Sequence, residues 1–186
     1  MSDLFDIVDG DDRVIGQAPR SECHGNPRLV HRAAHVLLFN AAGQLLLQKR
    51  APDKDIQPDR WDTSVGGHLD PGENYLTAAR REMVEELGLR DLPLHFLYYS
   101  RIRNQVESGN IATYLARAEN WGDYSRREIS ALRWWPPDEI DAALGSGIFT
   151  PNFEQEWAAW LNWRRENPQL YERWCGGGGD LPLSGI

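Results

Sequence analysis

The stretch that decides the fold runs from Gly67 to Leu89 and reads GHLDPGENYLTAARREMVEELGL. Its first part predicts a glycine-rich turn that starts at Gly66 and ends at Gly72. Its second part predicts a helix that begins near Glu73. Gly88 ends this helix, because glycine readily adopts the left-handed conformation of a helix C-cap.

Three glutamates of the predicted helix share one face. Glu82, Glu85 and Glu86 stand at positions i, i+3 and i+4, which brings their side chains together. Like charges at this spacing repel and cost a few tenths of a kcal/mol per pair, roughly, unless a cation lies between them. Hard cations such as Mg2+ prefer oxygen ligands. The spacing therefore favours a cation site, and the alternative is a solvated acidic face.

The length and composition of the chain restrict its class. Its 186 residues suit one sizeable α/β domain and hardly two. The formal net charge of -8 and pI of about 5.1 are unsuited to wrapping a nucleic-acid backbone. We expect a single domain over residues 1–175, with a core over 28–145 and a flexible glycine-rich tail over 176–186.

The sequence also bears on location. No apolar run reaches transmembrane length, and the acidic N-terminus lacks the pattern of a signal peptide. Cys23 and Cys175 lie far apart without metal-type spacing, so we expect reduced thiols in a cytoplasmic protein. We expect no membrane partner, and the sequence leaves open whether the protein is a monomer or a homodimer.

Alternation and turn residues predict a strand-rich middle between helices. The expected strands and helices are an N-terminal hairpin over 4–17, strands over 31–39, 44–49, 61–65, 94–103, 111–118 and 129–135, and helices over 138–144 and within 151–175. The late tryptophans have the spacing of core residues. Together these elements predict an α/β fold in which a mixed central sheet lies between helices.

The glycine-to-leucine stretch has a recognisable pattern. Fixed residues at Gly67, Glu73, Arg81-Glu82, Glu85-Glu86 and Gly88 match the signature box of the Nudix hydrolases, which the chain resembles. The resemblance implies an α/β/α Nudix sandwich and a Mg2+-dependent enzyme, with Mn2+ as an alternative ion. It implies hydrolysis of a diphosphate linkage in a small molecule, such as a nucleoside di- or triphosphate or another X-linked diphosphate.

The box suggests a role for each of its polar residues. We predict that Glu82, Glu85, Glu86 and the carbonyl of Gly67 hold the metal, because carboxylate clusters suit metal-assisted phosphoryl chemistry. Glu85 and Glu86 are the predicted catalytic residues. Glu85 is our choice of general base, and a glutamate from a later loop is the alternative.

Glu73 and Arg81 have a different predicted role. They are eight residues apart, about two helical turns. We expect them to form an ion pair that closes the loop onto the helix, rather than to take part in catalysis.

The resemblance extends beyond the box to one branch of the superfamily. Segments 29–33, 38–40, 43–50 and 64–68 look like isopentenyl-diphosphate isomerases, over roughly residues 5–118. His24, His31 and His68 match three histidines that bind a metal in those enzymes. They are either a second metal site or a relic of one.

Two basic residues match positions that hold the diphosphate in the isomerases. These are Arg50 and Lys54, whose cationic groups suit phosphate oxygens. We predict that they bind substrate. The alternative is that they are solubilising charges around a loop.

The chain departs from the isomerases at two positions. Gly66 stands where they have a catalytic cysteine, and their catalytic glutamate aligns near Asn110, with Glu107 close by. Isomerisation needs a proton donor and a base, so these changes argue against it. We therefore predict a hydrolase, with isomerase-like activity or a non-catalytic binding module as alternatives.

Overall fold

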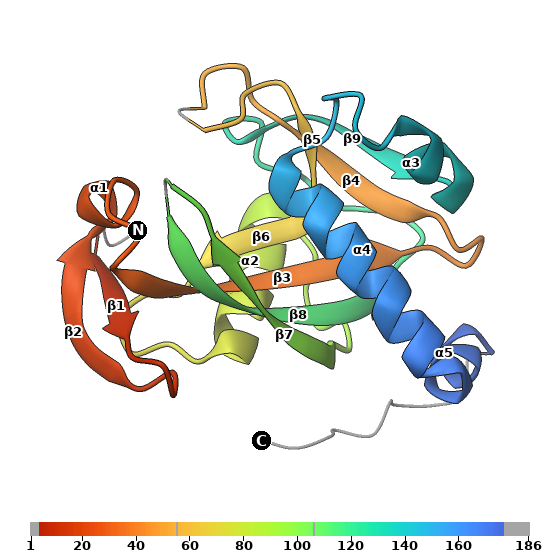
Figure 1. Cartoon of the computed structure of the whole chain (residues 1–186). Helices are drawn as coiled ribbons and strands as arrows, with labels where there is room; N and C mark the ends of the chain where they lie inside the picture. Colours follow the sequence, from red (N-terminus) through yellow and green to blue (C-terminus); the bar gives the residue numbers. More distant parts are fainter. Residues whose placement is uncertain (1–3, 55, 106, 177–186) are drawn as a thin grey trace.

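The computed structural model describes residues 4–54, 56–105 and 107–176 (Figure 1). Apart from Gly176, the predicted tail lies outside these residues. The described elements are β1 (Leu4–Val8), β2 (Val14–Pro19), α1 (Arg20–Cys23), β3 (Val30–Phe39), β4 (Leu45–Arg50), β5 (Trp61–Asp62), β6 (Val65–His68), α2 (Tyr75–Leu87), β7 (His95–Arg103), β8 (Ser108–Arg117), β9 (Ile129–Trp135), α3 (Pro137–Ala143), α4 (Pro151–Glu166) and α5 (Pro168–Cys175).

The main sheet is mixed, as predicted. Its strand order is β5-β4-β3-β8-β7, with β6 paired to β3 and β9 paired to β4. The β3–β8 ladder is parallel and the other ladders are antiparallel. Strands β3 and β4 pair only at Phe39 and Leu45. Beyond this pair the two strands separate, and β3 pairs instead with β6.

Helices cover both faces of the sheet (Figure 1). On β3, Ala34, Val36 and Leu38 belong to the hydrophobic cluster beneath α2. Leu37 and Phe39 belong to a second cluster with α3, α4 and α5. This alternation along one strand confirms the predicted α/β/α layering, because successive side chains of a strand point to opposite faces.

Helix α2 has a cap at each end. The side chain of Asn74 accepts a hydrogen bond from the Thr77 amide at 2.9 Å, so the helix begins at Tyr75, two residues after the expected start. Gly88 has a φ of 65° and ends the helix in the left-handed conformation, as predicted.

The prediction of a turn at Gly66 and Gly67 was wrong. Both glycines lie in β6, where they pair with His35 and Ala34 of β3. The turn comes later, where the Glu73 amide donates to the Asp70 carbonyl at 2.9 Å. The single strand expected over 61–65 is also divided, between β5 and β6.

The predicted N-terminal hairpin is present as β1 and β2, next to the main sheet (Figure 1). Its inner side chains form a small cluster with Cys23. The carboxylate of Asp6 accepts hydrogen bonds from Arg32 of β3 at 3.0 Å and from the Gly72 amide at 2.8 Å. The hairpin is therefore tied to the loop that precedes α2.

The C-terminal helices complete the second cluster. Trp157 and Trp160 of α4 are buried there with Trp174 of α5, as expected of core tryptophans. Both cysteines are free. Among the described residues, no helix is long and apolar enough to cross a membrane.

Candidate active site

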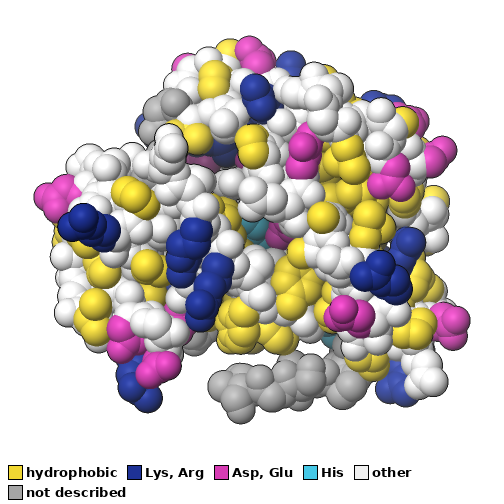
Figure 2. All heavy atoms as spheres, in the orientation of Figure 1, with side chains coloured by type: hydrophobic (Ala, Val, Ile, Leu, Met, Phe, Trp, Pro, Cys, Tyr) yellow, Lys and Arg dark blue, Asp and Glu magenta, His cyan; other side chains and the backbone are white. Residues whose placement is uncertain are grey.

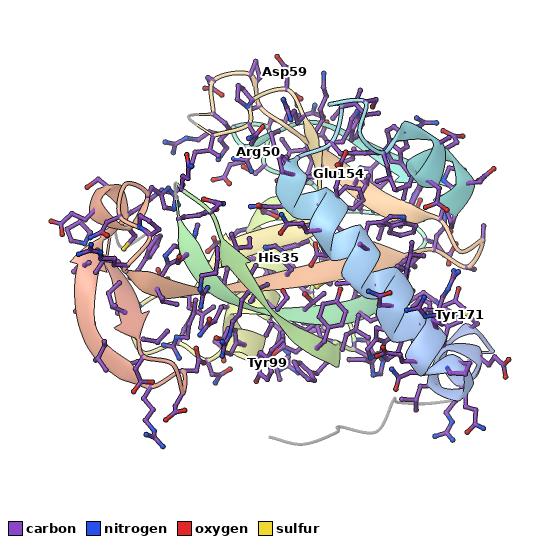
Figure 3. The ribbon with its side chains drawn as sticks, in the orientation of Figure 1. His35, Arg50, Asp59, Tyr99, Glu154 and Tyr171 are labelled. Carbon is purple, nitrogen blue, oxygen red and sulfur yellow. The ribbon has the colours of Figure 1, made fainter. Side chains whose placement is uncertain are left out.

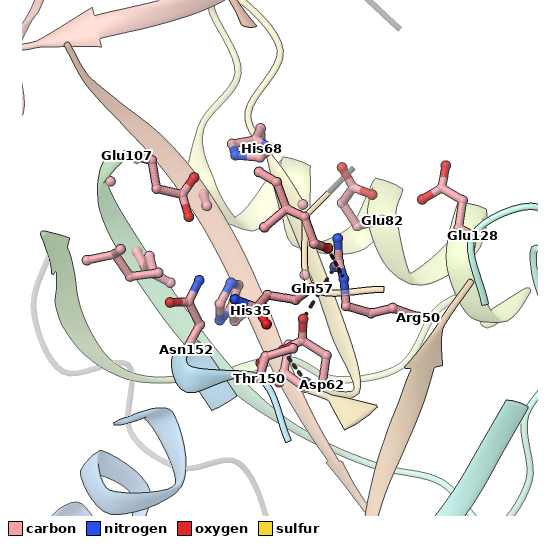
Figure 4. Close-up of a pocket in the computed structure, with 18 of the residues that line it drawn as sticks. His35, Arg50, Gln57, Asp62, His68, Glu82, Glu107, Glu128, Thr150 and Asn152 are labelled. Atoms are coloured by element: carbon pink, nitrogen blue, oxygen red, sulfur yellow. Dashed lines mark hydrogen bonds and ion pairs between the residues drawn. The ribbon is translucent and has the colours of Figure 1, made fainter. Parts of the chain in front are cut away.

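A cavity of about 410 Å³ opens where β3 and β4 separate (Figure 4). Residues of β3 and β6 form one wall, and residues of β4 and β5 form the other. In the space-filling view, a hollow near the middle of this face has histidine and acidic side chains at its bottom (Figure 2). The charged and histidine residues that line the cavity are Arg20, His24, His31, His35, Arg50, Lys54, Asp62, His68, Asp70, Arg81, Glu82, Glu86, Glu107 and Glu128.

Two glutamates of α2 face the cavity. Glu82 and Glu86 are one helical turn apart and both are buried. One carboxylate oxygen of Glu86 accepts hydrogen bonds from the Gln48 side chain at 3.0 Å and from the Gly66 amide at 3.2 Å. The helix and the edge of β6 therefore fix the position of this carboxylate.

The electrostatics of this pair fit a divalent cation. Burial raises the pKa of Glu86 well above its usual value, and the neighbouring charges of Glu82 and Glu128 raise it further. Burial also raises the pKa of Glu82, against the lowering effect of Arg81. Oxygen ligands with excess negative charge are what Mg2+ or Mn2+ prefers.

Glu85 lies at the rim of the site. Its side chain is 39% exposed and is not part of the cavity wall. The Arg81 guanidinium contacts Glu85 at 3.3 Å and Glu82 at 2.7 Å. The predicted ion pair between Arg81 and Glu73 is present, with Nη2 and Oε2 2.8 Å apart. Arg81 also donates to the His68 carbonyl at 2.9 Å, which ties α2 to β6.

The three predicted histidines come together at the other end of the cavity. His24, His31, His68 and the carboxylate of Glu107 each offer a ligand atom, and all four atoms lie within 4.8 Å of one another. Burial lowers the pKa of His31 to about 4, and it also lowers the pKa of His68 well below its usual value. Neutral imidazoles have a lone pair for a metal, so this donor set fits a transition-metal ion.

Arg50 and Lys54 also line the cavity, as the resemblance implies for substrate-binding residues. In this structure each has an acidic partner. Arg50 contacts Asp62 at 3.3 Å and donates to the Ile56 carbonyl at 3.0 Å (Figure 4). Lys54 contacts Glu128 at 3.4 Å.

The two positions that hold the catalytic cysteine and glutamate in the isomerases are Gly66 and, approximately, Asn110 in this chain. Gly66 lines the cavity, but Asn110 does not. The Asn110 amide donates to Asp12 at 2.6 Å and accepts from Arg103 at 2.9 Å. Glu107 is the acidic group that reaches the cavity from this part of the chain.

Several cavity residues were missed in the sequence. Arg20 donates to the His68 ring at 3.3 Å, and Gln48 donates to Glu86. Neither they nor Glu128 lie in a local pattern that marks a site. Glu156, which contacts the cavity residue His35 but does not itself line the cavity, did have a signal, because it stands on the apolar stripe of α4 between Phe153 and Trp160.

Comparisons with known proteins identify the family of the chain. The family model described as "NUDIX domain" matches residues 29–153. An uncharacterized Nudix hydrolase of Yersinia pestis is 34% identical over 168 residues, which cover 89% of this chain and 88% of that protein. The uncharacterized Nudix hydrolase YfcD of Salmonella typhi is 31% identical over 170 residues, 89% of each chain.

A solved structure gives the same result. The crystal structure of DR0079 from Deinococcus radiodurans has a TM-score of 0.69 and 29% sequence identity, and the match covers 79% of this chain and 91% of that chain. The family model, the relatives and the fold identify the same family. The chain belongs to the Nudix family and is a pyrophosphohydrolase of that family.

Proposed function

We propose that the protein is a Mg2+-dependent hydrolase that cleaves a diphosphate linkage in a nucleoside di- or triphosphate, or in a related X-linked diphosphate. The observation that carries the proposal is the buried pair Glu82 and Glu86, which faces a cavity and has raised carboxyl pKa values. A divalent cation between these groups relieves the repulsion that burial makes costly.

Glu82, Glu86 and the carbonyl of Gly67 would hold this ion, with Glu85 at the rim. Mg2+ is our proposal, and Mn2+ is the alternative. When bound, such an ion neutralises phosphate charge and lowers the pKa of a bound water. Gln48 and the Gly66 amide keep Glu86 oriented toward the cavity.

The remaining roles fall to charged groups of the cavity wall. Arg50 and Lys54 would bind phosphate oxygens, exchanging their present acidic partners for substrate. Two glutamates compete for the role of general base. Glu85 is the box candidate, and Glu128 is the later-loop candidate that lines the cavity. The Glu85→Gln and Glu128→Gln variants separate them, since only loss of the base removes the acidic limb of the pH–rate profile.

The first test is a substrate panel assayed with Mg2+ for phosphate release. It contains nucleoside di- and triphosphates, nucleotide sugars and isoprenoid diphosphates. We expect Glu86→Gln to lower turnover of the accepted substrate by about 10²-fold or more, because a metal ligand is lost. Glu166→Gln, on the exposed end of α4, is the matched control. Wild-type turnover by Glu86→Gln would contradict the metal assignment.

The histidine cluster supports a second metal site, formed by His24, His31, His68 and Glu107. We expect His31→Ala and Glu107→Gln to lose one bound metal per chain in elemental analysis, since each removes a ligand. His95→Ala, outside the cavity, is the control. Metal content equal to wild type in both variants, with melting curves that show folded protein, would mean that the cluster is a relic.

The histidine cluster also favours one alternative, an isomerase-like activity on isoprenoid diphosphates. Gly66 and Asn110 argue against it, because neither supplies the proton donor or base that isomerisation needs. Double-bond isomerisation without phosphate release would support this alternative. No turnover of any panel member would favour a non-catalytic binding module. For the domain organisation, we propose one Nudix domain over residues 1–175, since the hairpin and the C-terminal helices both pack on the matched region.

A further inference from the structure

One cavity residue is held by a partner far away in sequence. His35 of β3 and Glu156 of α4 are 121 residues apart, and Nδ1 of the histidine lies 3.0 Å from Oε1 of the glutamate. The Thr113 hydroxyl donates to the same oxygen at 3.0 Å. Figure 3 shows His35 at the middle of the sheet, on the side that α4 covers. Because a carboxylate only accepts, Nδ1 carries a proton and the ring orientation is fixed.

The other edge of the imidazole lies against Gly66 of β6. His35 pairs with Gly66 in the β3–β6 ladder, and its Nε2 lies 3.3 Å from where a Cβ on Gly66 would stand. The amide of the same Gly66 donates to Glu86. The His35 ring and the proposed metal ligand Glu86 therefore both lie next to Gly66. Among the described residues, none forms a hydrogen bond with Nε2.

Charged groups on several elements surround this ring. Burial acts against its protonation, but Glu156 of α4, Asp62 of β5 and Glu107 before β8 act in the opposite direction, so the pKa of His35 is raised. His68 of β6 is held neutral nearby. The pKa of Glu156 is lowered, because His35 and the Thr113 hydroxyl act against its burial. Both directions favour an imidazolium beside a carboxylate.

Three basic side chains of the cavity already have acidic partners, and Arg20 contacts the His68 ring. Arg50 contacts Asp62, Lys54 contacts Glu128, and Arg81 contacts Glu73. By contrast, His35 has its partner on Nδ1, and its ring is part of the cavity lining (Figure 4). An imidazolium in this position is a preorganised donor for an anionic oxygen.

We propose that His35 is a substrate-binding residue that donates a hydrogen bond from Nε2 to a phosphate oxygen of the diphosphate, and that Glu156 is its positioning residue. This inference rests on the proposed diphosphate substrate. It assigns a phosphate contact to the face of the cavity opposite Arg50, supplied by residues outside the Nudix box.

The test is binding of methylenediphosphonate with Mg2+, measured by titration calorimetry between about pH 6 and pH 9. This probe has a non-hydrolysable bridge, so the result is independent of turnover. Lack of hydrolysis with binding intact would contradict the proposed function alone. His35→Asn keeps a donor toward Glu156 and removes the one toward the cavity. His95→Asn is the matched control. The phosphonate groups of the probe also titrate in this pH range, and the control shows their effect on binding without a change at His35.

We expect His35→Asn to weaken binding about tenfold or more at the lower pH, because a charge-assisted hydrogen bond is lost. Relative to the control, wild-type binding weakens as pH rises through the pKa of His35, and this dependence disappears in His35→Asn. In Glu156→Gln the weakening moves to lower pH, a shift also readable from the ¹⁵N resonances of the imidazole. Wild-type affinity in His35→Asn, no binding by wild type, or an unchanged midpoint in Glu156→Gln would overturn the proposal.

Discussion

At Gly67 the sheet lies directly against the proposed metal ligand Glu82. A Cβ built on it would overlap the carboxyl carbon of Glu82 and lie 2.6 Å from its Cγ. Position 67, in the middle of β6, therefore requires glycine, because the Glu82 side chain occupies the space of a Cβ. Any larger residue would move Glu82 out of its place beside the cavity.

Gly67→Ala tests this requirement. We expect a loss of stability of about 1–3 kcal/mol from overpacking, together with loss of most activity, because Glu82 is displaced. Urea unfolding and phosphate release measure the two effects. Gly10→Ala is the control, since a Cβ at Gly10 has nothing within 4 Å. Full activity in Gly67→Ala would show that Glu82 is not needed where it stands.

At the same scale, sequence reasoning found the site only where spacing was local. Glu82 and Glu86 were predicted because one helical turn separates them. Glu156 was missed although it interrupts an apolar stripe, a position where a carboxylate must have a partner. Glu128 has no such signal, because its place in the cavity depends on how its loop folds back onto Lys54.

At the scale of elements, the end of helix α2 is defined by its C-cap residue, Gly88. Gly88 combines a φ of 65° with a close neighbour, because a Cβ there would lie 2.6 Å from the Asp123 carbonyl oxygen and 2.9 Å from the Asp123 nitrogen. The helix end is thus packed against the loop that leads to Glu128 and β9. The sequence predicted the end of the helix but not this contact.

Gly88→Ala separates backbone strain from this contact. Gly145 has a similar φ of 72° with nothing within 4 Å of a built Cβ, so Gly145→Ala measures strain alone, roughly 1 kcal/mol. We expect Gly88→Ala to cost more, by about 1–3 kcal/mol, because the loop backbone must move. Chemical unfolding of both variants gives the comparison. Equal losses would mean that the loop adjusts freely.

The elements that were predicted poorly share a physical cause. The strand signal of β6 is hidden by its two glycines, which read as a turn but are there to let Glu82 and His35 approach. Most long elements were correct to within one or two residues, because their periodicity and caps are local. The bounds of short strands depend on packing against other elements, and this packing cannot be read from a short stretch of sequence.

At the scale of the whole molecule, the site exists because the sheet divides. Strands β3 and β4 share one residue pair and then separate, which leaves the edge of β6 facing β4 across the cavity. The Gln48–Glu86 hydrogen bond joins β4 to α2 at this opening, and the His35–Glu156 contact joins β3 to α4. The pairing that opens the sheet is long-range, so the shape of the pocket, and with it the substrate, was not predictable from local pattern.

The burial of Glu86 at this opening also predicts how the stability of the whole protein depends on pH and on metal. The pKa of Glu86 is raised in the folded protein, so its contribution to stability is fully present below the pKa of the unfolded chain, about 4.3. It is lost as pH rises through the raised pKa. Glu86→Gln removes this penalty. In metal-free protein near about pH 8 we therefore expect the variant to be more stable than wild type, with a difference that shrinks toward about pH 4.5.

Mg2+ should reverse this order, because binding to the folded state stabilises it by RT ln(1 + [L]/Kd), about 2.7 kcal/mol at 100 times Kd. Wild type gains this stabilisation, whereas Glu86→Gln gains less of it because it lacks a ligand. Thermal unfolding of both proteins, in chelator and in excess Mg2+ at two pH values, measures both the cost of burying the Glu86 charge and the stabilisation by Mg2+. A metal-free variant that is less stable than wild type near about pH 8 would mean that the Gln48 and Gly66 hydrogen bonds outweigh the burial of the charge. Equal stabilisation of both proteins by Mg2+ would instead place the ion away from Glu86. The opening between β3 and β4 would then be a substrate site without this metal ligand.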